Sequence, residues 1–136
     1  MDNLLQGNVL DRIKDIPSKS IQTVVTSPPY WGLRNYGEDE QLGLEETPEE
    51  YVHHMVQVFR GVRDALKDDG TLWLNIGDSY ASSGQFGKPG EQSIGPKELS
   101  YGRAPTPPGL KVKDLVGIPW RLAFALQRDD WFLRQD

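Results

Sequence analysis

The sequence predicts an α/β fold, and three segments carry this prediction. Residues 20–26 are rich in β-branched side chains and too short for a helix, so we expect a strand there. A helix of about 20 residues is expected from Thr47 onward, because apolar side chains repeat with helical spacing. Residues 71–77 form a second apolar segment of strand length. The connection is long enough for a right-handed parallel crossover, so we expect a mainly parallel sheet with flanking helices.

The central helix has the clearest start signal in the chain. Thr47-Pro48-Glu49-Glu50 fits a capping box, with Thr47 at the N-cap and Glu50 reaching back to it. Apolar side chains then follow at steps of three and four, and we expect Asp68-Asp69-Gly70 to end the helix. This face must lie on a sheet or on another helix. Its members are Val52, Met55, Val56, Phe59, Val62 and Leu66.

Shorter elements are expected before the first buried strand. Residues 3–7 form an apolar run that ends in glycine, which predicts a short strand. Residues 9–16 place apolar side chains at helical spacing, and Pro17 stops the helix that they predict. From Glu38 to Glu50 the chain has seven acidic residues and no basic ones, which is typical of a solvated loop and a helix entrance.

The second half of the chain alternates between irregular and periodic sequence. Residues 81–110 contain six Gly and five Pro, which predicts a long Gly/Pro-rich loop, and loops of this length are usually functional or disordered. Residues 115–127 repeat apolar side chains helically, with Pro119 either in the first turn or at a kink. Residues 131–134 begin another apolar segment, so we expect the sequence to be cut rather than complete.

Length and composition limit the class of protein. The chain has 136 residues, enough for one compact domain. It has no Cys, which excludes a disulfide framework and a thiolate metal site, and we expect no metal. Its net charge of -5 argues against a protein that mainly wraps phosphate backbones with a basic face. No segment has the length and apolar character of a membrane span or a signal peptide, so we expect a cytoplasmic protein without a membrane partner.

A proline-rich motif follows the first buried strand. Thr26-Ser27-Pro28-Pro29-Tyr30-Trp31 lies at the carboxyl end of that strand, where open α/β sheets place their ligands. The two prolines fix the backbone, and Tyr30 offers a flat face to a planar ring. Together with the Ser27 hydroxyl and a proline carbonyl, this loop suits a nucleobase pulled out of its stack. Taken alone, such a loop is more often a plain rigid turn.

Four blocks of sequence resemble, in the same order, the N-terminal half of the amino-group DNA methyltransferases of the β arrangement. The agreement covers nearly the whole chain, which makes it far more specific than the proline motif alone. The resemblance implies a partial Rossmann-like methyltransferase fold that depends on S-adenosylmethionine, with residues 1–136 as a single incomplete catalytic domain. The four blocks are residues 27–34, 41–45, 69–79 and 113–121.

The resemblance also implies an activity. Such enzymes transfer a methyl group from S-adenosyl-L-methionine to the exocyclic amine of a flipped base in double-stranded DNA, as in restriction-modification systems. The Ser form of the motif favours cytosine N4 over adenine N6. Direct transfer needs no covalent intermediate, so the acceleration would come from positioning and fixed dipoles. The implied catalytic residues are Ser27, Pro28, Pro29 and Tyr30, with Ser27 and the Pro28 carbonyl drawing the amine hydrogens out of the ring plane.

Cofactor contacts are implied at five positions. Asn8 stands where the family usually has Asp, so it can form a hydrogen bond without a charge. Asp78 follows a strand end, and a turn cap explains an Asp there equally well. Asp114 precedes a helix, where an N-cap role has about the same weight. The implied S-adenosylmethionine contacts are Asn8, Asp78, Lys113, Asp114 and Leu115.

The family's Phe-x-Gly-x-Gly cofactor loop is not found, because Gly84, Gly87 and Gly90 have the wrong spacing. We therefore expect the isolated chain to bind S-adenosylmethionine weakly or not at all, and to form homo-oligomers through an unpaired sheet edge.

Two alternative functions remain open. One is a catalytically incomplete fragment that acts as an assembly or binding module, and the other is a methyltransferase of RNA or free nucleotides. His53 and His54 are adjacent and cannot share one helix face, so neither receives a role.

Overall fold

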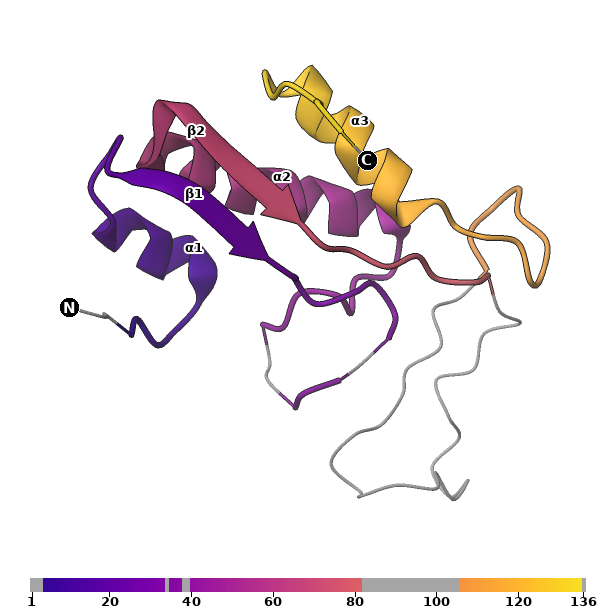
Figure 1. Cartoon of the computed structure of the whole chain (residues 1–136). Coiled ribbons are helices and arrows are strands. Elements are labelled where there is room, and N and C mark those ends of the chain that lie inside the picture. The colour runs from indigo at the N-terminus through magenta and orange to yellow at the C-terminus, as the bar shows by residue number, and fades with distance from the viewer. Residues whose placement is uncertain (1–3, 34, 38–39, 82–105, 136) are drawn as a thin grey trace.

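A computed structural model describes residues 4–33, 35–37, 40–81 and 106–135. The predicted α/β class is confirmed, since helices accompany a sheet of two strands in the described part of the chain (Figure 1). The elements, in chain order, are α1 (Val9–Arg12), the short 3₁₀ helix η1 (Ile13–Asp15), β1 (Ile21–Thr26), α2 (Pro48–Ala65), β2 (Leu66–Leu74) and α3 (Ile118–Arg128).

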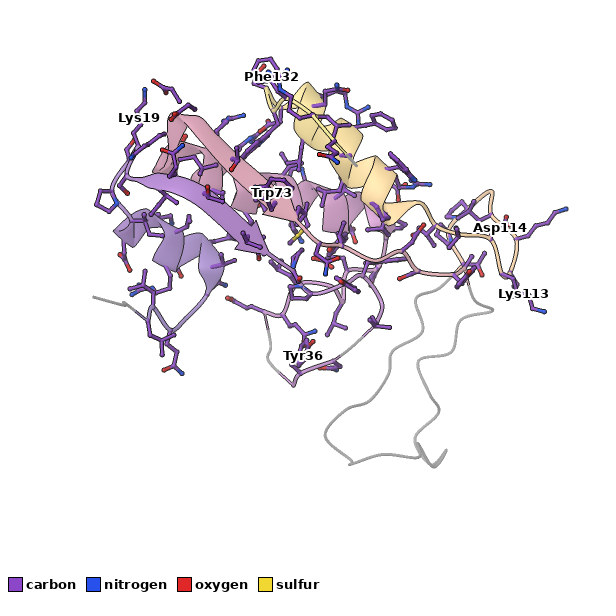
Figure 2. The ribbon with its side chains drawn as sticks, in the orientation of Figure 1. Lys19, Tyr36, Trp73, Lys113, Asp114 and Phe132 are labelled. Atoms are coloured by element: carbon purple, nitrogen blue, oxygen red, sulfur yellow. The ribbon has the colours of Figure 1, made fainter. Side chains whose placement is uncertain are left out.

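Strands β1 and β2 are parallel, as the sequence predicted, and α2 connects them. Val24 pairs with Leu72, and both side chains pack against the core on the side of α2. The next pair, Val25 and Trp73, points the other way because side chains alternate along a strand. Val25 is 77% exposed and Trp73 is 59% exposed, so the described residues cover one face of the sheet and leave the opposite face open (Figure 2).

The predicted capping box at the start of α2 is confirmed. The Thr47 hydroxyl accepts a hydrogen bond from the Glu50 N–H at 3.2 Å, and the Glu50 carboxylate accepts one from the Thr47 N–H at 3.3 Å. The buried face of the helix is rotated slightly from the predicted one, since Tyr51 and Val58 are buried while Val52 and Val56 are only partly so. The buried helix residues are Pro48, Tyr51, Met55, Val58, Phe59, Val62 and Ala65.

Helix α2 ends earlier than predicted, at Ala65 rather than at residues 68–70. The backbone N–H groups of Lys19 and Ser20 donate hydrogen bonds to the carbonyls of Asp64 and Ala65, in the last turn of the helix, at 3.0 Å each. In a longer helix, these two carbonyls would instead accept hydrogen bonds from N–H groups of the next turn. Leu66 pairs with Ile21, the first residue of β1, and regular pairing resumes at Thr71, which lies opposite Thr23. Residues 67–70 therefore interrupt the pairing of β2 with β1. The Asp-Asp-Gly signal therefore marks a bulge in the strand and not the helix end.

At the N-terminal end, residues 4–7 form no strand, so that prediction was wrong for the described part of the segment. The run has no partner strand there, and Leu4 is 95% exposed. The short helix predicted over residues 9–16 is confirmed as α1 followed by η1. Asn8 begins it, since its side-chain oxygen accepts a hydrogen bond from the Leu10 N–H at 2.9 Å.

Helix α3 begins at Ile118, three residues later than predicted, and Pro119 lies in its first turn, so the helix has no proline kink. Leu115 instead forms an antiparallel bridge with Tyr80. The helix packs beside α2 (Figure 1), and Arg60 of α2 forms an ion pair with Asp129 at the end of α3. Its buried residues are Ile118, Leu122 and Leu126.

Residues 131–134 form no regular element, although Trp131 packs against the core. Most of the predicted irregular segment, residues 82–105, lies outside the described residues. In the described part of the chain, no helix has the length and apolar character needed to cross a membrane.

Candidate functional site

The proline loop lies directly after β1, at the carboxyl end of both parallel strands. Beside it is a hollow of about 410 Å³, within the range of roughly 300–1,000 Å³ that is common for small-molecule sites. The Ser27 side chain is exposed toward solvent and forms no hydrogen bond with the described residues. The hollow is lined by Ser27, Pro28, Pro29, Tyr30, Leu33 and Tyr36. Tyr36 lies on the loop beyond the sheet (Figure 2).

The Tyr30 ring rests on the backbone just beyond β2. A Cβ atom added at Gly77 would lie 2.9 Å from Cε2 of Tyr30, which is closer than Cβ atoms approach such carbons in proteins, and 3.1 Å from its Cδ2, which is a tight contact. Only glycine therefore leaves room for the ring in this position. The contact joins the loop after β1 to the segment after β2, so both strand ends shape the hollow.

Gly77→Ala is expected to displace the Tyr30 ring from its present position. The added methyl group forces the ring off its rotamer, at a cost of about 0.5–1.5 kcal/mol. The ring must move away from residue 77, so its environment should change more than the fold does. NMR of the Tyr30 ring protons, together with urea unfolding, measures both effects. Unchanged ring resonances would contradict the contact.

Three side-chain hydrogen bonds hold the proline loop to the rest of the chain. The Tyr51 hydroxyl donates to the Pro29 carbonyl at 2.9 Å. The Ser79 hydroxyl donates to the carbonyl of the buried Trp31 at 2.6 Å, and the Trp31 indole N–H donates to the Glu45 carbonyl at 2.9 Å. The loop is thus fixed from α2, from the segment after β2 and from the turn before α2.

The surroundings of Tyr51 favour the neutral phenol, which is the form that can donate to the Pro29 carbonyl. Tyr51 is fully buried, and burial raises the pKa of its phenol, with the negative charge of Glu45 and the neighbouring Tyr30 adding to the effect. The Glu45 carboxylate accepts a hydrogen bond from the Gly43 N–H at 2.8 Å and lies 3.0 Å from Nδ1 of His54. Tyr51 therefore keeps its proton and can donate at any physiological pH.

Asp78, an implied cofactor contact, caps α3. Its carboxylate accepts hydrogen bonds from the backbone N–H groups of Ser79 at 2.8 Å, Gly117 at 2.9 Å and Ile118 at 2.9 Å. Gly117 is the N-cap residue and has a φ of 81°, a conformation that favours glycine. Because glycine has no side chain to accept a hydrogen bond from the first turn, the Asp78 carboxylate provides the cap. Of the two roles expected for Asp78, the geometry shows the structural one.

The remaining implied cofactor contacts lie at separate places. The Asn8 amide donates to the Glu40 carboxylate at 3.2 Å beside the start of α1. Lys113, Asp114 and Leu115 lie in an exposed segment that pairs with residues 79–81 through backbone hydrogen bonds. Figure 2 shows Lys113 and Asp114 at one end of the molecule.

Asp114 is not the N-cap of the last helix, so that alternative was wrong. Its carboxylate accepts a hydrogen bond from the Lys111 N–H at 2.9 Å instead, inside a tight turn. Among the described residues, two of the five implied contacts, Asn8 and Asp78, use their side chains as helix caps, and residues 113–115 lie beside the segment that follows Asp78. In the same part of the chain, no group of three His, Asp or Glu side chains could hold a metal ion.

Sequence reasoning missed four residues that shape the hollow. Leu33 and Tyr36 line it, but they lie in an irregular segment where no periodicity indicates their direction. The role of Gly77 could not be predicted, because it depends on the contact with the Tyr30 ring, which is far away in sequence. Tyr51 could have been found, because it lies four residues before Met55 on the same helix face.

The described residues define an α/β protein with a hollow at the carboxyl end of its parallel strands. Residues 21–136 match the model of a family described as DNA methylase, the family of N6 and N4 methyltransferases, and the chain belongs to this family. No solved structure matches the chain significantly.

Three type II methyltransferases illustrate the similarity. The chain is 51% identical to M.SmaI of Serratia marcescens over 133 residues, which cover 98% of the chain and 45% of that protein. It is 53% identical to M.XycI of Xanthomonas campestris pv. cyanopsidis over 133 residues, which cover 98% of the chain and 44% of that protein. With M.SfiI of Streptomyces fimbriatus the identity is 44%, over 96% of the chain and 28% of the relative. The chain therefore spans less than half the length of these relatives.

Proposed function

We propose that the protein carrying this chain is a site-specific DNA methyltransferase. It transfers a methyl group to the exocyclic amine of a base flipped out of double-stranded DNA, with cytosine N4 favoured over adenine N6. S-adenosylmethionine supplies the methyl group. The observation that carries the proposal is the hollow beside Ser27, Pro28 and Tyr30, which follows a parallel strand in a chain of the DNA methylase family.

The chain's own residues would hold the base. An exocyclic amine is a donor and needs acceptors, and the Ser27 hydroxyl and Pro28 carbonyl have no hydrogen-bond partner among the described residues. The Tyr30 ring, supported on Gly77, offers a face for stacking, and Tyr36 lines the same hollow. Because the loop backbone is anchored before the base arrives, these groups would act by positioning the amine, and the proton that the methylated amine must lose would pass to the surrounding water.

A direct test is methyl incorporation into DNA. The purified protein is incubated with labelled S-adenosylmethionine and unmethylated duplex DNA, and the product is digested to nucleosides. We expect N4-methyldeoxycytidine in the digest. N6-methyldeoxyadenosine would overturn the cytosine preference, and label in RNA but not in DNA would overturn the DNA substrate. The absence of label in any nucleic acid would refute the proposal as a whole.

Ser27→Ala is expected to lower the rate of methyl transfer about tenfold, since it removes one hydrogen bond of roughly 1.4 kcal/mol to the amine. The side chain is exposed, so the stability of the fold should hardly change. Ser18→Ala is the matched control, because the Ser18 hydroxyl contacts the Asp64 carbonyl near the opposite end of β1. A normal rate for Ser27→Ala, or an equal loss for both variants, would exclude the role of Ser27.

A second candidate function is a catalytically incomplete module that assembles with a second chain. The outward-facing Val25 and Trp73 favour it, because adjacent exposed apolar side chains on a sheet face are typical of a surface that another segment covers. The methyl-incorporation assay separates the two candidates. If the chain transfers methyl groups only after a second polypeptide is added, the module function is supported.

A further inference from the structure

The proline pair limits how the loop can be held in place. Neither Pro28 nor Pro29 has a backbone N–H, so at these residues the carbonyls are the only backbone groups that can be anchored. The Pro29 carbonyl accepts a hydrogen bond from the Tyr51 hydroxyl at 2.9 Å. The Pro28 carbonyl forms no hydrogen bond with the described residues. One carbonyl of the pair is therefore fixed to α2 and its neighbour is left for a ligand.

Tyr51 is a rigid anchor for this contact. Its side chain is 0% exposed, and it lies in the first turn of α2, directly after the capping-box residue Glu50. Its backbone N–H donates to the Thr47 carbonyl at 3.2 Å, so the start of the helix holds it in place. Burial also keeps the phenol protonated, and a neutral phenol is a donor over the whole physiological pH range.

We infer that Tyr51 is a positioning residue for methyl transfer, which fixes the Pro29 peptide so that Ser27 and the Pro28 carbonyl remain directed at the base. Tyr51 itself does not line the hollow. Its effect therefore passes through the loop backbone. This inference rests on the proposed function, because it assigns a purpose to the loop geometry that only a bound amine would use.

The support behind Tyr51 is extensive. Glu45, whose side chain is 7% exposed, binds the Gly43 N–H and His54 through its carboxylate and the Trp31 indole through its carbonyl. Among the described residues, however, Tyr51 is the one side chain that forms a hydrogen bond with the proline pair. Removing its hydroxyl should free the Pro29 peptide while the surrounding contacts stay in place.

The test is Tyr51→Phe, which removes the hydroxyl and keeps the ring. We expect kcat for methyl transfer to fall about tenfold, the effect of one lost hydrogen bond, with KM for DNA unchanged because the DNA is still bound. In protein labelled with ¹³C at proline carbonyls, the Pro29 resonance should move upfield. Tyr80→Phe is the matched control, since Tyr80 is 67% exposed, and it should change neither kcat nor the Pro29 resonance.

The outcomes separate this inference from the proposed function. If the unmodified protein methylates DNA and Tyr51→Phe keeps its kcat, the inference is overturned and the proposed function stands. If the unmodified protein transfers no methyl group, both fall together. A difference in the Pro29 carbonyl resonance between H₂O and D₂O reports the hydrogen bond without any substitution. Its absence would also overturn the inference, even if the Phe variant failed to fold.

Discussion

Asp78→Ala is expected to destabilise the chain by about 2–4 kcal/mol, the largest loss that we predict for a single polar side chain. The carboxylate accepts hydrogen bonds from the N–H groups of Ser79, Gly117 and Ile118, and alanine leaves all three without this acceptor. Ile118 is fully buried, so water can replace the lost acceptor only in part. Urea unfolding followed by circular dichroism measures the loss.

Two further variants test the cause of this loss. Asp78→Asn keeps one side-chain oxygen, so its loss should be intermediate. Asp114→Ala removes an acceptor that serves one N–H in an exposed turn, and it should cost well under half as much. Equal losses for Asp78→Ala and Asp114→Ala would show that capping of α3 is not what stabilises the fold.

The same cap links stability to the site. Asp78 fixes the start of α3, and its neighbour Ser79 donates to the Trp31 carbonyl at the end of the proline loop. Gly77, one residue earlier, supports the Tyr30 ring. Three consecutive residues after β2 therefore join a helix, a buried tryptophan and a candidate base-binding ring. A change at Asp78 should consequently lower activity as well as stability.

Much of the fold could be predicted from local sequence signals. The capping box at Thr47, the apolar periodicity of α2 and the β-branched run of β1 all act through neighbouring residues, and the structure confirms each of them. The helix end was mistaken because Asp68-Asp69-Gly70 is a good stop signal by itself. The actual end depends on N–H groups of residues 19 and 20, far away in sequence, which no local pattern reveals.

The candidate site, like the fold, could be predicted where it depends on local sequence and not where it depends on residues far away in the chain. The position of the proline loop at a strand end could be predicted, because it depends on the order of a strand and a proline pair. The contacts that support the loop could not, since Tyr51 and Gly77 reach it from 22 and 47 positions further along the chain. For Asp78 the sequence left two roles open, and only the location of the α3 N-terminus shows that the carboxylate is a cap.

Tyr30→Ala is expected to slow methyl transfer about 5-fold to 150-fold, which corresponds to the loss of roughly 1–3 kcal/mol of stacking with the base. The alanine variant keeps the Ser27 hydroxyl and the Pro28 carbonyl, so the amine still finds its acceptors but the ring plane is no longer fixed. Single-turnover rates of methyl transfer measure the effect. Duplexes with 2-aminopurine at the target base show by fluorescence whether the base is still extruded.

Tyr30→Phe is the control for this prediction, because it keeps the aromatic face and should retain most of the rate. Tyr36→Ala should cost less, since Tyr36 is 51% exposed and lines the hollow without the support that Gly77 gives to Tyr30. A rate that is unchanged in Tyr30→Ala, or reduced equally in Tyr30→Phe, would remove the stacking role. The acceptors at Ser27 and Pro28 would then have to orient the base alone, and two hydrogen bonds to one amine leave the base free to swing about the line that joins the two acceptors. An aromatic surface at Tyr30 is what limits that motion in the proposed site.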